Sequence, residues 1–278
     1  MKPRIAIPLP HGTDPEYAER AIPQYERAVE LSGGEPVRIP LNRTPAEVMK
    51  LIEHCDGVLL PGSKADVDPA KFGAARHPKT EAADPKRDTV DELLLQDAYN
   101  MRKPVLGICY GLQILNVYRS GTLVQHIESP INHEAGRKVP VAHEVEIDPG
   151  SKLAEVVGFW EISVGDVSGK GTSSTRAEKP SSDSRALAPV VRLVISTNSS
   201  HHQSADLIGD GLKIVAKCPE DGIIEALEGT SPDHFVMAVQ WHPERSFEDD
   251  ERSKKIFQAL VEAASQKHKE LVGEFEGR

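Results

Sequence analysis

Short apolar runs alternate with longer amphipathic segments over roughly the first 120 residues of the chain. The apolar runs predict strands at residues 4–9, 37–39, 57–60 and 105–108. Apolar residues at helical spacing predict helices at residues 15–31, 45–55, 88–101 and 110–119. Uniformly apolar strands that alternate with helices are typical of a parallel sheet covered on both faces. We therefore predict a doubly wound α/β core.

The pattern changes in the second half of the chain. Strand-like segments follow one another closely there, at residues 143–147, 193–196, 213–217, 223–227 and 235–239. Closely spaced strands favour antiparallel pairing, so we expect an antiparallel extension of a mostly parallel sheet with flanking helices. An amphipathic helix is predicted from residue 249 to about 264, and residues 265–278 are expected to form a charged tail. One domain over residues 1–264 follows.

Residues 165–189 differ from the rest of the chain in composition. The segment GDVSGKGTSSTRAEKPSSDSRALAP contains few apolar residues, too few for their burial to offset the entropy cost of ordering it. We predict a mobile insertion in the domain. A surface loop without function is one interpretation of it, and a lid or partner contact is the other.

Charge and composition exclude several classes of protein. The chain has 33 Lys and Arg against 43 Asp and Glu, a net charge of −10, which disfavours binding to nucleic acid. It lacks an apolar run of the roughly 18 residues that cross a membrane, and proline interrupts the start MKPRIAIPLPHG too early for a signal peptide. Its 3 cysteines lack C-x-x-C spacing, which argues against disulfides and zinc knuckles. We expect a cytoplasmic protein without a cofactor.

One cysteine has the surroundings of a nucleophile. Cys109 follows a predicted buried strand, precedes a predicted helix and lies between Gly107 and Gly111 within the sequence GICYG. This is the arrangement of a nucleophile elbow with Cys in place of Ser. The helix N-terminus favours a thiolate at Cys109, and the backbone N–H of Tyr110 then faces a reacting carbonyl as an oxyanion donor. The alternative is a buried cysteine with a purely structural role.

A candidate general base and its partner follow the last predicted strand, in the sequence WHPE. Proline biases His242 toward an extended backbone, in which residues i and i+2 project to the same side. Glu244 is therefore expected to hold the His242 imidazole, fixing its tautomer and leaving the other nitrogen to accept the proton of Cys109.

Two further loops are candidates for contacts with a substrate. Gly62 and Ser63 follow a predicted central strand, where glycine permits close approach of the backbone, and they are candidates for the second oxyanion donor. An ordinary turn is the alternative. Ser200, His201 and His202 lie in the polar loop NSSHHQ, which we interpret as a substrate-contacting loop, with a solvated loop as the alternative. Metal binding is disfavoured there, because adjacent side chains diverge and the usual zinc spacings are absent.

Taken together, these segments resemble class I glutamine amidotransferase-like hydrolases, specifically the γ-glutamyl-γ-aminobutyrate hydrolase group of the C26 peptidases. The resemblance runs through VLLPGSKADVDPAKFG, GICYGLQILNVYRSGTLVQHI, NSSHHQSADLIGDGLKIVAKCPEDGIIEALE and VMAVQWHPE, in family order. It implies a flavodoxin-like fold, a catalytic triad of Cys109, His242 and Glu244, and a small γ-glutamyl amide as substrate. A thioester on Cys109 would be hydrolysed by water, releasing glutamate and an amine. A homodimer is a further family expectation.

The resemblance also implies how the substrate is held. Gln113 and the backbone from Ser200 to His202 would bind the glutamyl head. Many relatives carry Arg where this chain has Tyr110, so contacts beyond the γ-amide, and with them the leaving amine, differ. Two other functions fit the same residues: a glutaminase component that supplies ammonia to a partner synthase, and a binding protein without catalytic activity.

Overall fold

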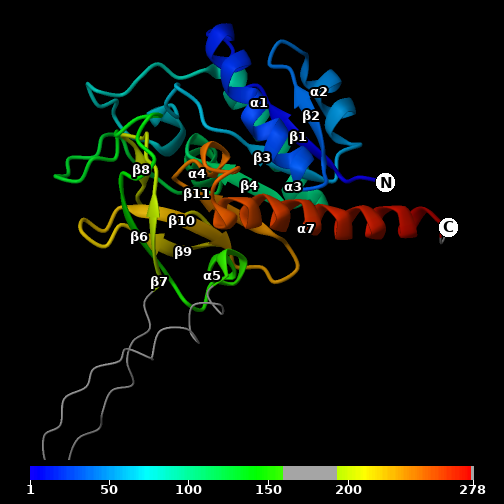
Figure 1. Cartoon of the computed structure of the whole chain (residues 1–278). Helices are drawn as coiled ribbons and strands as arrows, with labels where there is room; N and C mark the ends of the chain where they lie inside the picture. Colours follow the sequence, from blue (N-terminus) through cyan, green and yellow to red (C-terminus); the bar gives the residue numbers. More distant parts are fainter. Residues whose placement is uncertain (159–192, 277–278) are drawn as a thin grey trace, which may run out of the picture.

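The strands form one large mixed sheet and one small sheet (Figure 1). The computed structural model describes residues 1–158 and 193–276. The large sheet has 9 strands in the order β2-β1-β3-β4-β11-β10-β9-β6-β7, and β5 pairs with β8 in the small sheet. Their bounds are β1 Arg4–Pro8, β2 Glu35–Ile39, β3 Gly57–Leu60, β4 Val105–Ile108, β5 Leu123–Val124, β6 His143–Ile147, β7 Leu193–Thr197, β8 Ser204–Ala205, β9 Leu212–Lys217, β10 Ile224–Gly229 and β11 Val236–Val239.

The strand pairing confirms the predicted mostly parallel sheet with an antiparallel extension. Each neighbouring pair from β2 to β11 is parallel, and each pair from β11 to β7 is antiparallel. The carboxyl ends of β3, β4 and β11 therefore meet at one edge of the sheet, with β4 between the other two. The segments that follow these three strands contain the candidate catalytic residues.

Helices cover both faces of the parallel part. The α-helices are α1 Pro15–Leu31, α2 Pro45–Ile52, α3 Pro85–Met101, α4 Tyr110–Tyr118, α5 Lys152–Val157 and α7 Glu251–Glu276, and the 3₁₀ helices are η1 Pro69–Phe72 and η2 Pro243–Arg245. One apolar core includes side chains of α1, α5 and α7, and the other includes side chains of α2, α3 and α4. Figure 1 shows α7 running along one side of the sheet beside α1. The sheet is thus buried between two helical layers, which explains its uniformly apolar central strands.

Local sequence signals explain several helix boundaries. Thr44 caps α2 through a capping box, because its side chain accepts from the Glu47 backbone N–H while the Glu47 carboxylate accepts from the Thr44 backbone N–H. Asp14 caps α1 by accepting from the Tyr17 backbone N–H. The predicted end of the last helix near residue 264 is wrong, since α7 continues to Glu276. A hydrogen bond from His268 to Asp56 at 2.9 Å holds this continuation against the body of the protein.

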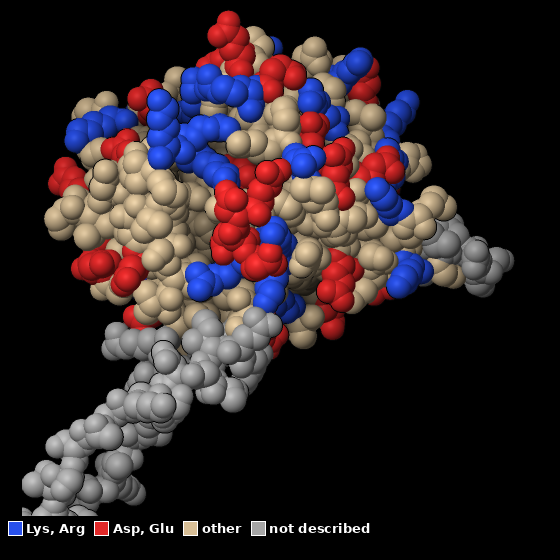
Figure 2. All heavy atoms as spheres, in the orientation of Figure 1, with Lys and Arg blue, Asp and Glu red and all other residues tan. Residues whose placement is uncertain are grey.

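Two predictions concern regions for which the structure gives limited information. The insertion predicted at residues 165–189 lies outside the described residues. Within the described ranges 1–158 and 193–276, the helices are too short or too polar to cross a membrane. Acidic and basic side chains are interspersed over the face of the molecule seen in Figure 2.

Candidate active site

A sharp turn joins β4 to α4 and contains Cys109. Its φ of 53° and ψ of −105° lie outside the regions that residues with a Cβ normally adopt, a kind of strain that occurs often at functional positions. Space requires the flanking glycines, because a Cβ on Gly107 would lie 2.7 Å from the Gly111 carbonyl oxygen and one on Gly111 would overlap the Leu60 carbonyl. The turn therefore has the backbone geometry of a nucleophile elbow.

The sheet topology brings Cys109 and His242 together. The backbone N–H of Cys109 donates to the Val239 carbonyl at the end of β11, at 2.8 Å. A Cβ built on Gly62, just after β3, would lie 3.1 Å from Cε1 of His242 and 3.7 Å from Cβ of Cys109. The thiol-bearing side chain and the imidazole therefore flank the same glycine, which leaves no space there for a larger residue.

His242 is held from two sides. Its Nδ1 lies 2.8 Å from Oε1 of Glu244, as the i, i+2 spacing predicted, and both side chains are buried. Asn198 accepts from the His242 backbone N–H at 3.0 Å and donates to the His242 carbonyl at 2.9 Å. Nε2 of His242 is buried and has no hydrogen-bond partner within the described residues. A neutral imidazole that donates from Nδ1 to Glu244 presents this Nε2 as a proton acceptor.

Burial sets the protonation states of these groups. It raises the pKa of the Cys109 thiol to about 12 and lowers the pKa of His242 below its ordinary value. For Glu244, burial acts to raise the pKa, but His242 and the Arg245 guanidinium together hold it below its usual range. The thiolate predicted from the helix N-terminus is therefore wrong for the resting site, since burial outweighs the dipole. The resting pair is a neutral thiol and a neutral imidazole beside a carboxylate.

The candidate oxyanion donors differ in their availability. Gly62 donates its backbone N–H to the Tyr25 hydroxyl at 3.2 Å. Ser63 uses its hydroxyl to accept from the Ala65 N–H at 3.1 Å, and its own backbone N–H has no partner in the described part of the chain. Tyr110 opens α4 and points its hydroxyl away to Asp88, at 2.7 Å. Ser63 and Tyr110 both line the cavity in front of Cys109, whereas the Gly62 N–H is already engaged.

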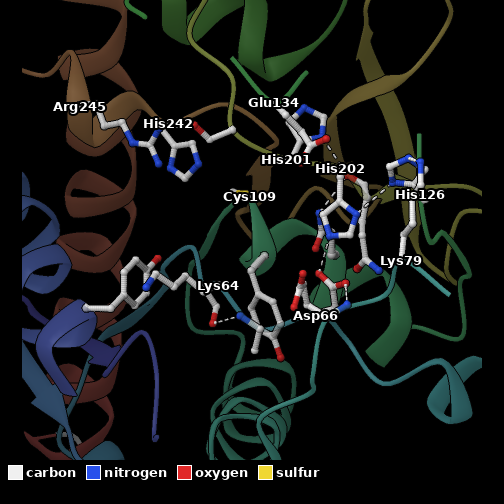
Figure 3. A pocket seen from close by; sticks show the side chains of 18 residues that line it. Lys64, Asp66, Lys79, Cys109, His126, Glu134, His201, His202, His242 and Arg245 are labelled. Carbon is white, nitrogen blue, oxygen red and sulfur yellow. Dashed lines mark hydrogen bonds and ion pairs between the residues drawn. The ribbon is translucent and has the colours of Figure 1, made fainter. Parts of the chain in front are cut away.

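Cys109 and His242 lie in the wall of a cavity of about 610 Å³ (Figure 3). The cavity contains side chains of both charges. Its basic residues are Lys64, Lys79 and Arg245, and its acidic residues are Asp66, Glu81 and Glu134. Such a wall can bind a ligand that itself has both positive and negative groups.

Arg245 lies beside the catalytic pair and was not predicted from the sequence. Its Nη1 donates to the Ser200 hydroxyl at 2.7 Å, and its Nε lies 3.4 Å from Oε1 of Glu244. The guanidinium therefore links the loop after β7 to η2. A basic residue directly after the acid of a candidate triad is the signal that could have indicated it.

The opposite wall contains two histidines. Nε2 of His202 lies 3.1 Å from Oδ1 of Asp66, and this hydrogen bond raises the pKa of His202. The Nδ1 atoms of His202 and His126 are 3.3 Å apart, and Nε2 of His126 lies 2.8 Å from Nζ of Lys79. His202 is thus at the cavity, as predicted. Asp66, Lys79 and His126 come from loops that show no motif, so sequence reasoning missed them.

Two other predicted contacts are arranged differently. Gln113 lies in the cavity wall and donates its amide to the Gln203 carbonyl at 3.1 Å, which leaves its oxygen for a ligand. His201 also borders the cavity, but its Nδ1 lies 2.9 Å from the Gln203 carbonyl and its Nε2 is 3.6 Å from Oε1 of Glu225. The imidazoles of His201 and His202 therefore point in different directions, as expected for adjacent residues in an extended segment.

Comparison with known proteins connects this geometry to a family. The model of the family described as Peptidase C26 matches residues 10–177 and 176–244. A Mycobacterium tuberculosis protein named "putative glutamine amidotransferase" is 34% identical over 245 residues, which are 87% of this chain and 66% of that protein. The chain thus spans just under two thirds of that relative. The glutamine amidotransferase-like protein RP404 of Rickettsia prowazekii is 31% identical over 262 residues, 90% of each chain.

A hydrolase and a solved structure complete the comparison. The γ-glutamyl-γ-aminobutyrate hydrolase PuuD of Escherichia coli K12 is 27% identical over 254 residues, covering 86% of this chain and 84% of PuuD. A Thermoplasma acidophilum protein described as a GMP synthase subunit shares the fold, with a TM-score of 0.57 and 14% identity over 98% of each chain. The fold is therefore that of class I glutamine amidotransferases.

Proposed function

This chain belongs to the peptidase C26 family, and from the geometry of its cavity we propose that it is a cysteine-dependent hydrolase of γ-glutamyl amides. The observation that carries the proposal is the buried His242, which is hydrogen-bonded to Glu244 through Nδ1 and has an unpartnered Nε2 within the described residues. The ring flanks Gly62 together with Cys109 at the elbow. A base with its acceptor nitrogen free beside a thiol is the arrangement that nucleophilic catalysis requires.

The proposed chemistry has two stages. In the first, His242 Nε2 takes the thiol proton as the Cys109 sulfur attacks the γ-carbonyl carbon, and the imidazolium then gives that proton to the leaving amine. In the second, His242 takes a proton from water, which attacks the thioester and releases glutamate and the restored thiol. The backbone N–H groups of Ser63 and Tyr110 stabilise the oxyanion in both stages. Gly62 contributes by leaving space for the His242 ring.

The charges of the cavity support a γ-glutamyl substrate. The glutamyl head carries an α-carboxylate and an α-ammonium group, and it needs both a cation and an anion near the reacting carbonyl. Arg245 lies on the His242 side of the cavity, and Asp66 and Glu134 supply carboxylates elsewhere in its wall. Gln113 and the backbone from Ser200 to His202 complete the proposed binding site for the head. The leaving amine then faces the wall of Lys79 and His126.

Glutamate release from a panel of amides tests this proposal. The panel contains γ-glutamyl-γ-aminobutyrate, γ-glutamyl peptides and glutamine, with α-glutamyl and β-aspartyl isomers as matched controls. We expect glutamate from the γ-glutamyl compounds and no hydrolysis of the isomers, which place the carboxylate and ammonium groups differently. Absence of release from every γ-glutamyl compound, with circular dichroism showing folded protein, would leave only a role in binding and contradict the proposal.

A glutaminase component of an amidotransferase is the second candidate. The names of the M. tuberculosis and R. prowazekii relatives favour it, and the same residues would perform the same thioester chemistry with ammonia as the leaving group. It predicts that glutamine is the preferred member of the panel. It also predicts that glutamine hydrolysis rises when a partner synthase is added, whereas the proposed hydrolase acts alone at its full rate.

Glu244→Gln is expected to lower kcat by about 10⁴-fold, as loss of the acid does in a related triad. The amide oxygen or NH₂ would face Nδ1 without a negative charge, so neither the tautomer nor the imidazolium would be stabilised. Steady-state kinetics on the best γ-glutamyl substrate measures the loss. Glu248→Gln is the control, because Glu248 is exposed and pairs with Arg27 at the surface. A loss in Glu244→Gln no larger than in Glu248→Gln would contradict the role of the acid.

The pH profile of kcat/KM reports the buried His242. Because burial lowers its pKa, the imidazole stays neutral at the ordinary titration point of about pH 6.5. We expect kcat/KM to fall only at lower pH, as Nε2 becomes protonated and loses its acceptor function. Glu244 opposes the effect of burial, so the acid limb of Glu244→Gln should move to still lower pH. An acid limb above about pH 6.5, or one that moves up in the variant, would count against His242 as the base.

A further inference from the structure

Three histidines and one glutamate meet in a buried cluster outside the proposed triad. They are His133 from the loop after β5, His143 from β6, His201 from the loop after β7, and Glu225 from β10. All four residues are buried, and one ligand atom from each lies within 4.8 Å of the others. We call this set the His₃Glu cluster. Its members lie far apart in the sequence and meet only in the antiparallel extension of the sheet.

The separations within the cluster are those of ligands around one ion. Oε1 of Glu225 lies 3.3 Å from Nδ1 of His133, 3.5 Å from Nε2 of His143 and 3.6 Å from Nε2 of His201. These distances exceed the usual 2.7–3.2 Å of a hydrogen bond. Four ligands at about 2.05 Å from a tetrahedral ion are separated by about 3.4 Å. The cluster has nearly this spacing around Oε1.

The outward nitrogens fix the tautomers of the three imidazoles. His133 Nε2 lies 2.9 Å from Oδ2 of Asp221. His143 Nδ1 lies 3.1 Å from the Glu144 carbonyl, and His201 Nδ1 lies 2.9 Å from the Gln203 carbonyl. These partners only accept hydrogen bonds, so each outward nitrogen carries the proton. In the neutral ring each inward nitrogen therefore presents a lone pair, and histidine ligands of metal ions are usually held in this way.

The inward atoms have no donor to satisfy them. Within the described part of the chain, Nδ1 of His133, Nε2 of His143, Nε2 of His201 and both oxygens of Glu225 are buried without a hydrogen-bond partner. Buried acceptors that face one another are unfavourable. A single added proton would satisfy one contact and leave the others unpaired, while three protons would place three positive charges in one buried space. One divalent cation satisfies all four groups at once.

We propose that the His₃Glu cluster binds a divalent metal ion, with Zn²⁺ as the ion that best suits three imidazoles and one carboxylate at tetrahedral spacing. Such an ion would join the loop after β7 to β6 and β10. The same loop presents Ser200 and His202 to the cavity, and it is already tied to His133, whose carbonyl accepts from the His201 N–H at 2.9 Å. The ion would thus position one wall of the cavity. This inference does not depend on the proposed activity.

The expectation that the histidines of NSSHHQ bind no metal depended on spacing, and spacing alone could not reveal this cluster. The two adjacent side chains do diverge, so His202 joins Asp66 while His201 joins the cluster. The other members lie at residues 133, 143 and 225 and form no recognisable zinc motif.

Metal content and metal titration test the proposal on the full chain. The protein is freed of metal with a chelator, titrated with Zn²⁺, and measured by mass spectrometry of the metal and by melting temperature. Co²⁺ serves as a second probe, since a tetrahedral site gives it strong visible absorption. We expect one ion per chain and a higher melting temperature with Zn²⁺. Binding of less than a tenth of an ion per chain at excess Zn²⁺ overturns the proposal.

Single variants locate the ion. Glu225→Gln and His143→Asn each remove one ligand and are expected to abolish one-to-one binding, and two variants keep the test valid where one of them fails to fold. Asp221→Asn is expected to weaken binding by about 10–100-fold, because Asp221 only orients His133. His202→Asn, beside the cluster but outside it, should retain full binding. Unchanged binding in His143→Asn contradicts the assignment.

A competing group shares one of these histidines. Cys218 and Asp221 lie close to the outward nitrogen of His133 and could hold a cation there instead. Cys218→Ser distinguishes the two locations, because it leaves the His₃Glu cluster intact. We expect Cys218→Ser to bind metal as the unmodified chain does. Loss of binding in Cys218→Ser together with retention in Glu225→Gln would overturn the proposal in favour of the other group.

Discussion

Cys109→Ala is expected to lower the turnover of γ-glutamyl amides by about 10⁶-fold, the loss seen when the nucleophile of a comparable triad is removed. The variant deletes the sulfur that forms the thioester, and neither His242 nor the oxyanion donors can replace it. Water activated by His242 would leave only residual hydrolysis. Glutamate release under single-turnover conditions measures this loss.

The same variant should fold normally. Alanine retains the Cβ, so the strain at the φ of 53° is unchanged, and the lost sulfur is small. We expect the free energy of unfolding to change by about 1 kcal/mol or less. Cys55→Ala and Cys218→Ala are matched controls, because both cysteines are also buried and free but lie outside the cavity. Activity in Cys109→Ala at the level of these controls would exclude the proposed thioester.

Arg87→Met is expected to destabilise the protein by about 3–5 kcal/mol, the cost of breaking a buried ion pair on one side. Arg87 is fully buried in α3, with its Nε 2.8 Å from the carboxylate of Asp91. Its Nη2 donates to the Pro61 carbonyl at 2.9 Å and its Nη1 to the Pro10 carbonyl at 3.1 Å. Methionine would fill part of the space but leave Asp91 and both carbonyls without their donor.

The destabilisation should depend on pH. Burial raises the pKa of Asp91, and Arg87 acts against this rise. Without Arg87 the pKa of folded Asp91 rises further above its value in the unfolded chain. Folding then loses stability as pH increases, since the folded state must give up a proton that it holds tightly. Urea unfolding of Arg87→Met should therefore show a smaller deficit at about pH 4 than at about pH 8.

Arg38→Met is the control for this prediction. Arg38 also contacts two acidic side chains, Glu19 and Glu26, but at the surface, where its side chain is 38% exposed. Exposed ion pairs contribute at most about 1 kcal/mol, so this variant should remain close to the parent protein. Equal losses in Arg87→Met and Arg38→Met would show that the buried pair has no special role. Because Arg87 holds Pro61, the first variant should also disturb the adjacent Ser63.

Some features could be predicted because neighbouring residues specify them. The elbow at Cys109 depends on Gly107 and Gly111, which lie beside it in the chain, and the contact between His242 and Glu244 depends on a spacing of two residues. The walls of the cavity could not be predicted in this way. Arg245 meets Ser200, and His202 meets Asp66, across loops whose sequences show no regular pattern. The protonation state of Cys109 was also beyond local reasoning, since burial by the whole fold decides it.

The sequence by itself determined the alternation of apolar strands and amphipathic helices, the nucleophile turn at Cys109 and the pairing of His242 with Glu244, because periodicity, turn chemistry and short spacings act over a few residues. Only the tertiary structure decided that β4 lies between β3 and β11, which brings the residues after all three strands to one cavity. It also decided that His133, His143, His201 and Glu225 converge. Strand order and such convergence depend on packing between distant segments, and local patterns do not specify which segments will pack together.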